Sequence, residues 1–220
     1  MSASLLEQVK ASPLLPEIIQ EAQAELLREH ALRVKFYNDI TPEHKWEFIN
    51  GEVIMHSPAL NRHLMATKRL FQLMSVHCLA RKCGEVHVEK AMTSFPRNDY
   101  EPDISFFGIA KASLITPDTL KFPIPDLIVE VLSPSTEARD RGIKFTDYAA
   151  HGVREYWIVD TVAETVELNR LNGTSYDDAS VVRQHDGMLR SDVMPAFEVP
   201  VRAVFDDGAN LAALREVMGE

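Results

Sequence analysis

Asp126-Leu127-Ile128-Val129-Glu130-Val131-Leu132 is the stretch that decides the fold. It is a nearly continuous apolar run, which is typical of a central strand buried on both faces of a sheet. Because side chains alternate along a strand, Glu130 shares a face with Ile128 and Leu132. A carboxylate in such a strand is costly unless it is ion-paired, lies at a sheet end or binds a metal. Glu130 is therefore either a salt-bridged structural residue or part of a functional site.

The segments around this strand alternate between strand and helix patterns. After the turn and helix-cap segment Ser133-Pro134-Ser135-Thr136, apolar periodicity predicts a helix over 137–150 and strands over 155–160, 165–171, 174–184 and 198–203. Before the central strand, it predicts a helix over 60–82, strands over 85–94 and 102–107, and a polar connection over 108–125. Asn50-Gly51 between two apolar runs predicts a hairpin with a type I′ turn.

An amphipathic helix is predicted over 13–33, and a short helix from about 208. No repeat or linker divides the remainder. We therefore expect an N-terminal helical extension over 1–40, one α/β (α+β) domain over 41–205 with a central mixed sheet flanked by helices, and a C-terminal helix over 206–220.

Composition excludes several classes of protein. No apolar run approaches the roughly 18 residues that cross a bilayer, so no membrane association is expected. Two cysteines make a disulfide framework improbable, and the expected compartment is the reducing cytoplasm. The net charge of −10 disfavours tight coating of nucleic acid, because phosphate binding needs a basic surface. Weak or transient binding fits this charge better.

A second carboxylate stands at the start of a neighbouring predicted strand. Asp103 follows Pro102 and precedes Ile104-Ser105-Phe106-Phe107. It is either an ordinary polar residue at a strand start or a partner of Glu130. Two carboxylates on neighbouring strands can converge on Mg²⁺, which prefers oxygen ligands.

Four stretches together resemble a known family. They are Trp46–Glu52, Pro102-Asp103, Val129–Thr136 and Asp140–Asp160. Over about residues 40 to 205 the chain resembles the Uma-type family of putative restriction endonucleases, within the PD-(D/E)xK nuclease-like superfamily. The resemblance implies a restriction-endonuclease-like fold and Mg²⁺-dependent hydrolysis of phosphodiester bonds in nucleic acid, with DNA as the expected substrate and Mn²⁺ as a substitute ion.

The resemblance also implies roles for individual residues. Asp103, Glu130 and the backbone carbonyl of Val131 would hold the metal. Leu132 stands where the general pattern has its lysine, and the resemblance implies that Lys144 on the following helix replaces it. The structural alternative for Lys144 is a solvated helix lysine paired with Asp140 or Asp147.

Further candidates keep two interpretations each. Glu47 is either a third acid of the site or an edge-strand residue facing water. His63 either serves the site or packs at a helix N-terminus, and Tyr148 is expected in the core or behind the site. His77, Cys78, Cys83 and His87 invite a zinc interpretation, but their spacing is unlike compact zinc knuckles.

A second function class remains open. The chain would then be a catalytically weak or inactive nuclease-fold module that binds protein or nucleic acid, which the acidic balance favours. The N-terminal helix also suggests a homodimer.

Overall fold

The computed structural model describes residues 4–41, 43–176, 180–183 and 187–219. The chain divides into two compact units, Met1–His56 and Ser57–Glu220. The sequence-based bounds at 40 and 205 stay predictions.

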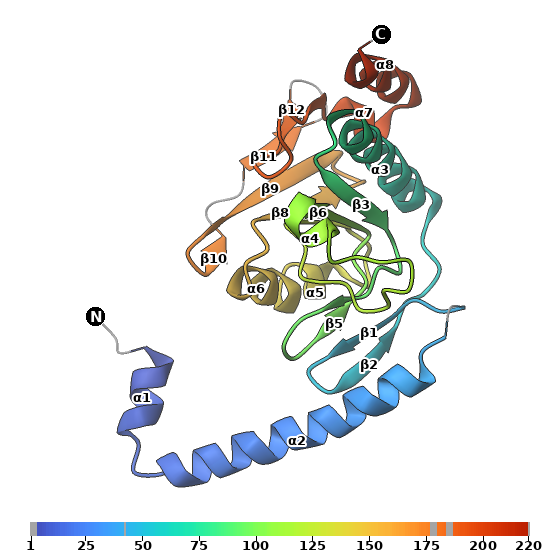
Figure 1. Cartoon of the computed structure of the whole chain (residues 1–220). Coiled ribbons are helices and arrows are strands. Elements are labelled where there is room, and N and C mark those ends of the chain that lie inside the picture. Colours follow the sequence, from blue (N-terminus) through green and yellow to red (C-terminus); the bar gives the residue numbers. More distant parts are fainter. Residues whose placement is uncertain (1–3, 42, 177–179, 184–186, 220) are drawn as a thin grey trace. The chain divides into compact units, whose positions relative to one another are not determined.

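The N-terminal unit is a helical segment followed by a hairpin (Figure 1). It contains α1 (Leu5–Ala11), α2 (Leu15–Asp39), β1 (Trp46–Ile49) and β2 (Glu52–Met55). The predicted amphipathic helix is confirmed and continues to Asp39. The predicted turn is also confirmed, because Asn50 and Gly51 have φ values of 49° and 81° and β1 pairs antiparallel with β2. Inside this unit, the Phe36 ring of α2 lies 5.7 Å from that of Phe48 in β1.

The larger unit is built on a mixed sheet with strand order β10-β9-β8-β7-β6-β3, and β11 also pairs with β9 (Figure 1). The bounds are β3 (Gly84–Val88), β6 (Ile104–Gly108), β7 (Leu127–Val131), β8 (Glu155–Asp160), β9 (Thr165–Asn172), β10 (Ser175–Tyr176) and β11 (Ser180–Arg183). Only β7 and β8 run parallel within this described sheet, while the other pairs are antiparallel. The predicted central mixed sheet is confirmed, and every residue of β7 is buried.

The remaining elements flank the sheet or form small hairpins. They are α3 (Asn61–Arg81), β4 (Thr93–Ser94), β5 (Asp99–Tyr100), α4 (Ile109–Ala112), α5 (Glu137–Asp140), α6 (Ile143–Ala150), β12 (Met188–Arg190), β13 (Glu198–Pro200), α7 (Arg202–Phe205) and α8 (Asp207–Met218). No helix in the described part of the chain combines the length and apolar character needed to cross a membrane.

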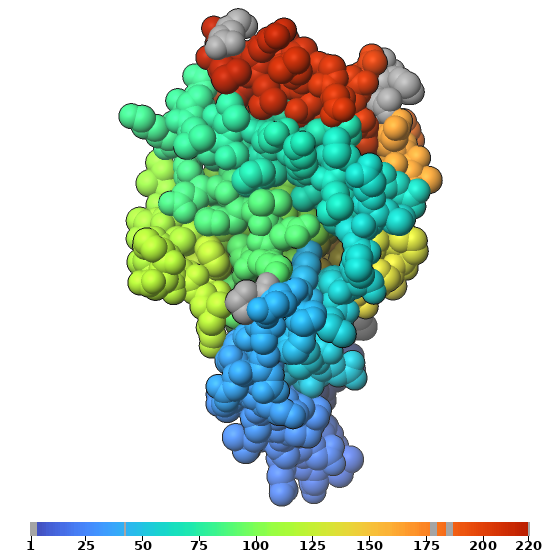
Figure 2. All heavy atoms as spheres, turned by 90° about the vertical axis from the view of Figure 1, so that its right-hand side faces the viewer, coloured from blue at the N-terminus to red at the C-terminus, as the bar shows by residue number. Residues whose placement is uncertain are grey.

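The two faces of β7 have different surroundings. Leu127, Val129 and Val131 join a hydrophobic core with apolar residues of α3 and of the C-terminal segment, as the alternation predicts. α8 packs against α3 on this side (Figure 2). On the other face, Lys144 of α6 reaches Glu130. The sheet therefore has an apolar face and a face with polar groups.

The predicted helix over 137–150 is wrong in one respect, because it is two helices. The chain turns between α5 and α6 at Gly142, which has φ −110° and ψ −103°. A Cβ atom at Gly142 would lie 2.6 Å from the carbonyl oxygen of Ala138, so a larger residue cannot occupy this turn without a shift. The break places Lys144 in the first turn of a new helix.

Other boundaries also differ from the predictions. The strand over 85–94 ends at Val88, because Glu89 and Lys90 are both left-handed with φ 46°. The strand over 198–203 ends at Pro200, and α7 begins at Arg202. The connection over 108–125 contains the short helix α4. Residues 177–179 and 184 of the predicted strand over 174–184 lie outside the described residues.

Candidate active site

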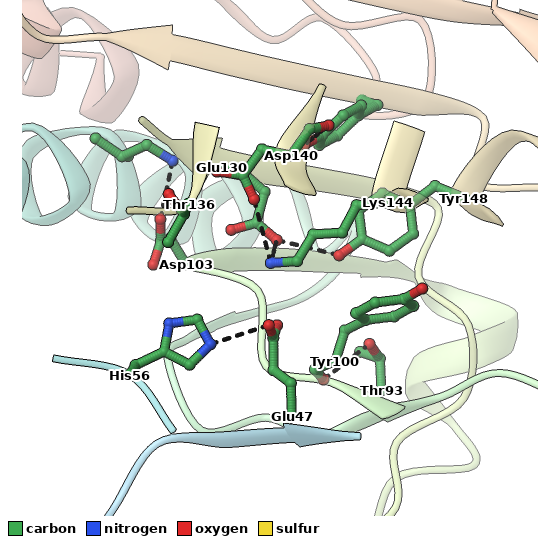
Figure 3. A network of polar contacts seen from close by, with 12 residues as sticks. Glu47, His56, Thr93, Tyr100, Asp103, Glu130, Thr136, Asp140, Lys144 and Tyr148 are labelled. Carbon is green, nitrogen blue, oxygen red and sulfur yellow. Dashed lines mark hydrogen bonds and ion pairs between the residues drawn. The ribbon is translucent and has the colours of Figure 1, made fainter. Parts of the chain in front are cut away.

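Asp103 and Glu130 face each other across neighbouring strands. Ile104 of β6 pairs with Val129 of β7 in antiparallel register, and continuing that register by one residue puts Asp103 opposite Glu130. Directly opposite residues project to the same face, with Cβ atoms about 4.5–5.5 Å apart. Figure 3 shows both carboxylates on one side of the sheet. The structure thus brings together the two acids that the sequence singled out.

Asp103 is fixed by the backbone of β7. Its side chain is buried, and one carboxylate oxygen, Oδ2, accepts a hydrogen bond of 2.8 Å from the N–H of Val131. The other oxygen, Oδ1, lies 3.4 Å from Nε2 of His63, near the start of α3. Oδ1 of Asp103 therefore faces a polar side chain instead of the hydrophobic core.

Glu130 is held by two groups from α6. Lys144 Nζ donates to Glu130 Oε1 at 2.9 Å, and the Tyr148 hydroxyl donates to the same oxygen at 3.1 Å (Figure 3). Lys144 also lies 3.3 Å from Asp140 Oδ1, four residues earlier in the chain. All four of these side chains are buried. The solvated alternative for Lys144 is wrong, since its side chain is 1% exposed, while its expected pairing with Asp140 is present.

Aromatic rings pack around this cluster. Tyr100 and Tyr148 pack edge to face with ring centroids 5.1 Å apart, and Lys144 Nζ lies 5.8 Å from the Tyr100 ring centroid. The Tyr156 hydroxyl donates to the backbone carbonyl of Asp140. Burial first, and then the Glu130 and Asp140 charges, raise the pKa of Tyr156 well above its usual value, so it stays a neutral donor. Low local polarity strengthens the charge interactions that remain.

A further carboxylate joins Asp103 from outside the predicted set. Ligand atoms of His63, Glu89 and Asp103 all lie within 4.8 Å of one another. The N–H of Glu89 donates to the backbone carbonyl of Asp103, which ties the end of β3 to the start of β6. Sequence reasoning weighed His63 but missed Glu89. The register signal that finds it is the antiparallel pairing of Val88 with Ile104, because the next pair is Glu89 and Asp103.

For two residues, Glu47 and Val131, the predicted role in the site stays a prediction. Glu47, in β1 of the N-terminal unit, is fully buried and its Oε2 lies 2.9 Å from Nε2 of His56. Its burial shows that the alternative of an edge residue facing water is wrong. Val131 contributes its N–H to Asp103, while the role of its carbonyl as a ligand stays a prediction.

The four residues of the zinc interpretation make other contacts. Cys78 Sγ lies 3.0 Å from Cys83 Sγ, and both cysteines are free and buried. Burial raises the pKa of the Cys78 thiol, which disfavours the thiolate that zinc requires. His77 Nε2 is 2.9 Å from the carbonyl oxygen of Pro195, and His87 Nε2 is 3.3 Å from Glu85.

The donor set of the site fits a divalent cation. The site is rich in carboxylates, since Glu130 and Asp140 contact Lys144 and Glu89 lies with Asp103 beside His63. Buried like charges repel strongly unless a cation compensates them. Carboxylate oxygens with one imidazole suit Mg²⁺, Mn²⁺ and related ions. The residues present thus fit the ion that the resemblance implies.

Comparisons with known proteins give the family of the chain and a solved structure of the same fold. Residues 30–202 match the model of the Uma2 family, described as putative restriction endonuclease. A crystal structure of a putative nuclease of the DUF820 family from Anabaena variabilis shares the fold, with a TM-score of 0.67, 17% identity, and coverage of 81% of this chain and 96% of that chain. An uncharacterized protein, slr1290, from Synechocystis is 28% identical over 130 residues, or 58% of this chain and 67% of its relative. The chain belongs to the Uma2 family of putative restriction endonucleases.

Proposed function

We propose that this protein is a divalent-metal-dependent endonuclease that hydrolyses phosphodiester bonds, with DNA as its substrate. The observation that carries the proposal is the buried cluster of Asp103, Glu130 and Lys144 on one face of the sheet. Membership of the Uma2 family supports it. A strand-interior carboxylate paired with a buried lysine is costly to build, so a purely structural domain gains little from it.

Each residue has a distinct task in this proposal. Asp103 and Glu130, with the Val131 carbonyl, would hold Mg²⁺ or Mn²⁺. When bound, such an ion polarises a phosphate and lowers the pKa of a water molecule. Lys144 positions Glu130 through its 2.9 Å contact and supplies positive charge beside the developing phosphate charge. Tyr148 holds the same Glu130 oxygen and so fixes its rotamer. Glu47 is proposed as a third acid.

Binding of nucleic acid should be weak without the metal. The chain carries 33 acidic against 23 basic residues, so its net charge opposes long-range attraction to phosphate. A divalent cation between the carboxylates and the phosphate would supply the missing attraction locally. Transient binding follows from this balance, as does sensitivity to chelators.

Cleavage of supercoiled plasmid and single-stranded DNA with Mg²⁺ or Mn²⁺ tests the proposal. The wild type should cleave, and Asp103→Ala and Lys144→Ala should lose at least about 100-fold in rate, the scale of removing one charge-stabilising group. Lys68→Ala, an exposed lysine of α3, is the matched control and should cleave normally. Circular dichroism would verify that every variant is folded.

The alternative is a module of this fold that binds protein or nucleic acid without hydrolysis. If wild type and all variants are equally inactive while folded, this alternative replaces the nuclease proposal. If all of them cleave equally, the residue assignments are wrong.

We also propose that the protein is a homodimer that pairs through α2. Large apolar side chains of this segment are exposed, namely Leu14, Ile19, Leu26 and Leu27. The first half of α2 carries Glu17, Glu21 and Glu25, whereas the second half carries Arg28, Arg33 and Lys35 together with Glu29 and Asp39. Antiparallel pairing of two copies would cover the apolar residues and place the acidic half of one copy beside the three basic residues of the other.

A further inference from the structure

The His63 imidazole is almost buried and only partly satisfied. Its side chain is 12% exposed, and Nδ1 is buried with no hydrogen-bond partner in the described part of the chain. Nε2 faces Asp103 Oδ1 at 3.4 Å. Nε2 is therefore the ring nitrogen that is placed to bind a metal beside the Asp103 carboxylate.

Glu89 completes a three-ligand group with His63 and Asp103. The ligand atoms lie within 4.8 Å of one another, while two ligands on opposite sides of a metal are roughly 4.2 Å apart at bond lengths near 2.1 Å. Small side-chain rotations are therefore enough to close the three donors on one ion.

The backbone at Glu89 is unusual in the same place. Glu89 and Lys90 both have φ 46°, a left-handed conformation that non-glycine residues rarely adopt. This conformation ends β3 and keeps the Glu89 carboxylate beside Asp103. Strain that persists at such a point commonly supports function.

We propose that His63, Glu89 and Asp103 bind a transition-metal dication, with Mn²⁺ favoured over Mg²⁺. The imidazole sets this preference, because nitrogen ligands favour transition metals, whereas Mg²⁺ selects oxygen. Asp103 is shared between this group and Glu130, which faces it across the strands. The part of the ion in hydrolysis rests on the proposed function, whereas binding of the ion is measured without nucleic acid.

Pulsed electron paramagnetic resonance of Mn²⁺ on the full chain tests this site, since it detects nitrogen-14 of a ligating imidazole. The wild type should show nitrogen modulation, and His63→Gln should lose it together with at least about tenfold in Mn²⁺ affinity. Glu89→Gln should weaken Mn²⁺ binding but keep the nitrogen signal. Mg²⁺ affinity, from competition against Mn²⁺, should fall much less in His63→Gln than Mn²⁺ affinity does.

His87→Gln is the matched control, because His87 also faces a carboxylate, Glu85, at 3.3 Å but belongs to no three-ligand group among the described residues. It should keep the wild-type signal. Absence of nitrogen modulation in the wild type, or its persistence in His63→Gln, overturns the inference even if DNA cleavage is normal. If His63 binds Mn²⁺ as expected and no preparation cleaves DNA, the site stands and the proposed function fails.

Discussion

At the scale of single residues, Lys144 is the group on which the site depends. Its ammonium is 1% exposed and contacts carboxylates of Glu130 and Asp140 at 2.9 and 3.3 Å. Burying an ammonium is costly, and these two carboxylates offset that cost. Removing the lysine would leave buried negative charge behind. Lys144 therefore affects stability as well as any chemistry, and the two effects must be measured separately.

Lys144→Met should lower the free energy of unfolding by about 3–5 kcal/mol in urea denaturation with chelator present, because Glu130 and Asp140 lose their cation. Adding Glu130→Gln to this variant should restore part of the loss, since one buried charge is then removed. The expected coupling energy of the pair lies at about 0.5–3 kcal/mol.

Lys10→Met is the matched control, because its ion pair with Glu7 is exposed on both sides. Its unfolding midpoint should equal that of the wild type. If the losses of unfolding free energy in Lys144→Met and Glu130→Gln simply add in the double variant, the two side chains do not interact as a buried ion pair.

The sequence was informative about the central acids and less so about their neighbours. Glu130 could be predicted because the amino-acid sequence alone reveals a carboxylate inside an apolar strand, where burial of the charge is costly. Glu89 could not, since its position depends on a left-handed backbone that the strand pattern over 85–94 conceals. The ion pair between Lys144 and Glu130 joins residues 14 apart and was not predicted, since the family resemblance implied only a catalytic role for Lys144.

At the scale of elements, local patterns predicted the strands and the long helices, and tertiary contacts decided their ends. The apolar run of β7 and the periodicity of α3 are local properties and were confirmed. The break at Gly142 depends on the close approach of the Ala138 carbonyl, which helical periodicity does not register. The sequence signal for this break is Gly142 itself, a glycine inside the predicted helix over 137–150.

Asp126 ties four elements together just before β7. It accepts a hydrogen bond from the Gly108 N–H at the end of β6, and pairs with Lys111 of α4 at 2.9 Å and with Arg154, next to β8, at 3.1 Å. Burial by itself acts to raise the pKa of Asp126. The Lys111 ammonium, the Gly108 N–H and Arg154 together outweigh it and lower the pKa below its ordinary value.

A carboxylate with a lowered pKa in the folded state stabilises the protein above its unfolded pKa of about 3.9, and this stability is lost as pH falls through the folded value. Asp126→Asn should therefore cost about 1–3 kcal/mol at pH 7. The difference from wild type should shrink as pH falls below about 4. Urea unfolding from pH 7 to pH 3 measures it, with exposed Asp118→Asn as the control. If the difference in unfolding free energy between wild type and Asp126→Asn does not change with pH, the ionised Asp126 carboxylate does not stabilise the fold.

At the scale of the whole molecule, the exposed apolar residues of α2 form the surface that a second copy would cover in the proposed homodimer. Analytical ultracentrifugation at tens of micromolar should give a dimer for the wild type. Leu26→Asp, which puts a charge where the residue is 56% exposed, should shift the protein to monomer.

Leu211→Asp in α8 is the matched control, since Leu211 is 51% exposed on another helix, and it should remain dimeric. A monomeric wild type, or equal dissociation of both variants, would contradict pairing through α2.

The net charge of −10 bears on the proposed nuclease function, because an acidic molecule that binds phosphate would need a cation at the site. The direct test is the rate of plasmid nicking after removal of metal with a chelator and readdition of Mg²⁺ or Mn²⁺, for wild type and for Glu130→Gln. We predict no nicking without metal, recovery in the wild type, and a rate at least about 100-fold lower in Glu130→Gln. Equal rates in the two proteins, or nicking that persists without metal, would contradict a nuclease site built on Asp103, Glu130 and Lys144.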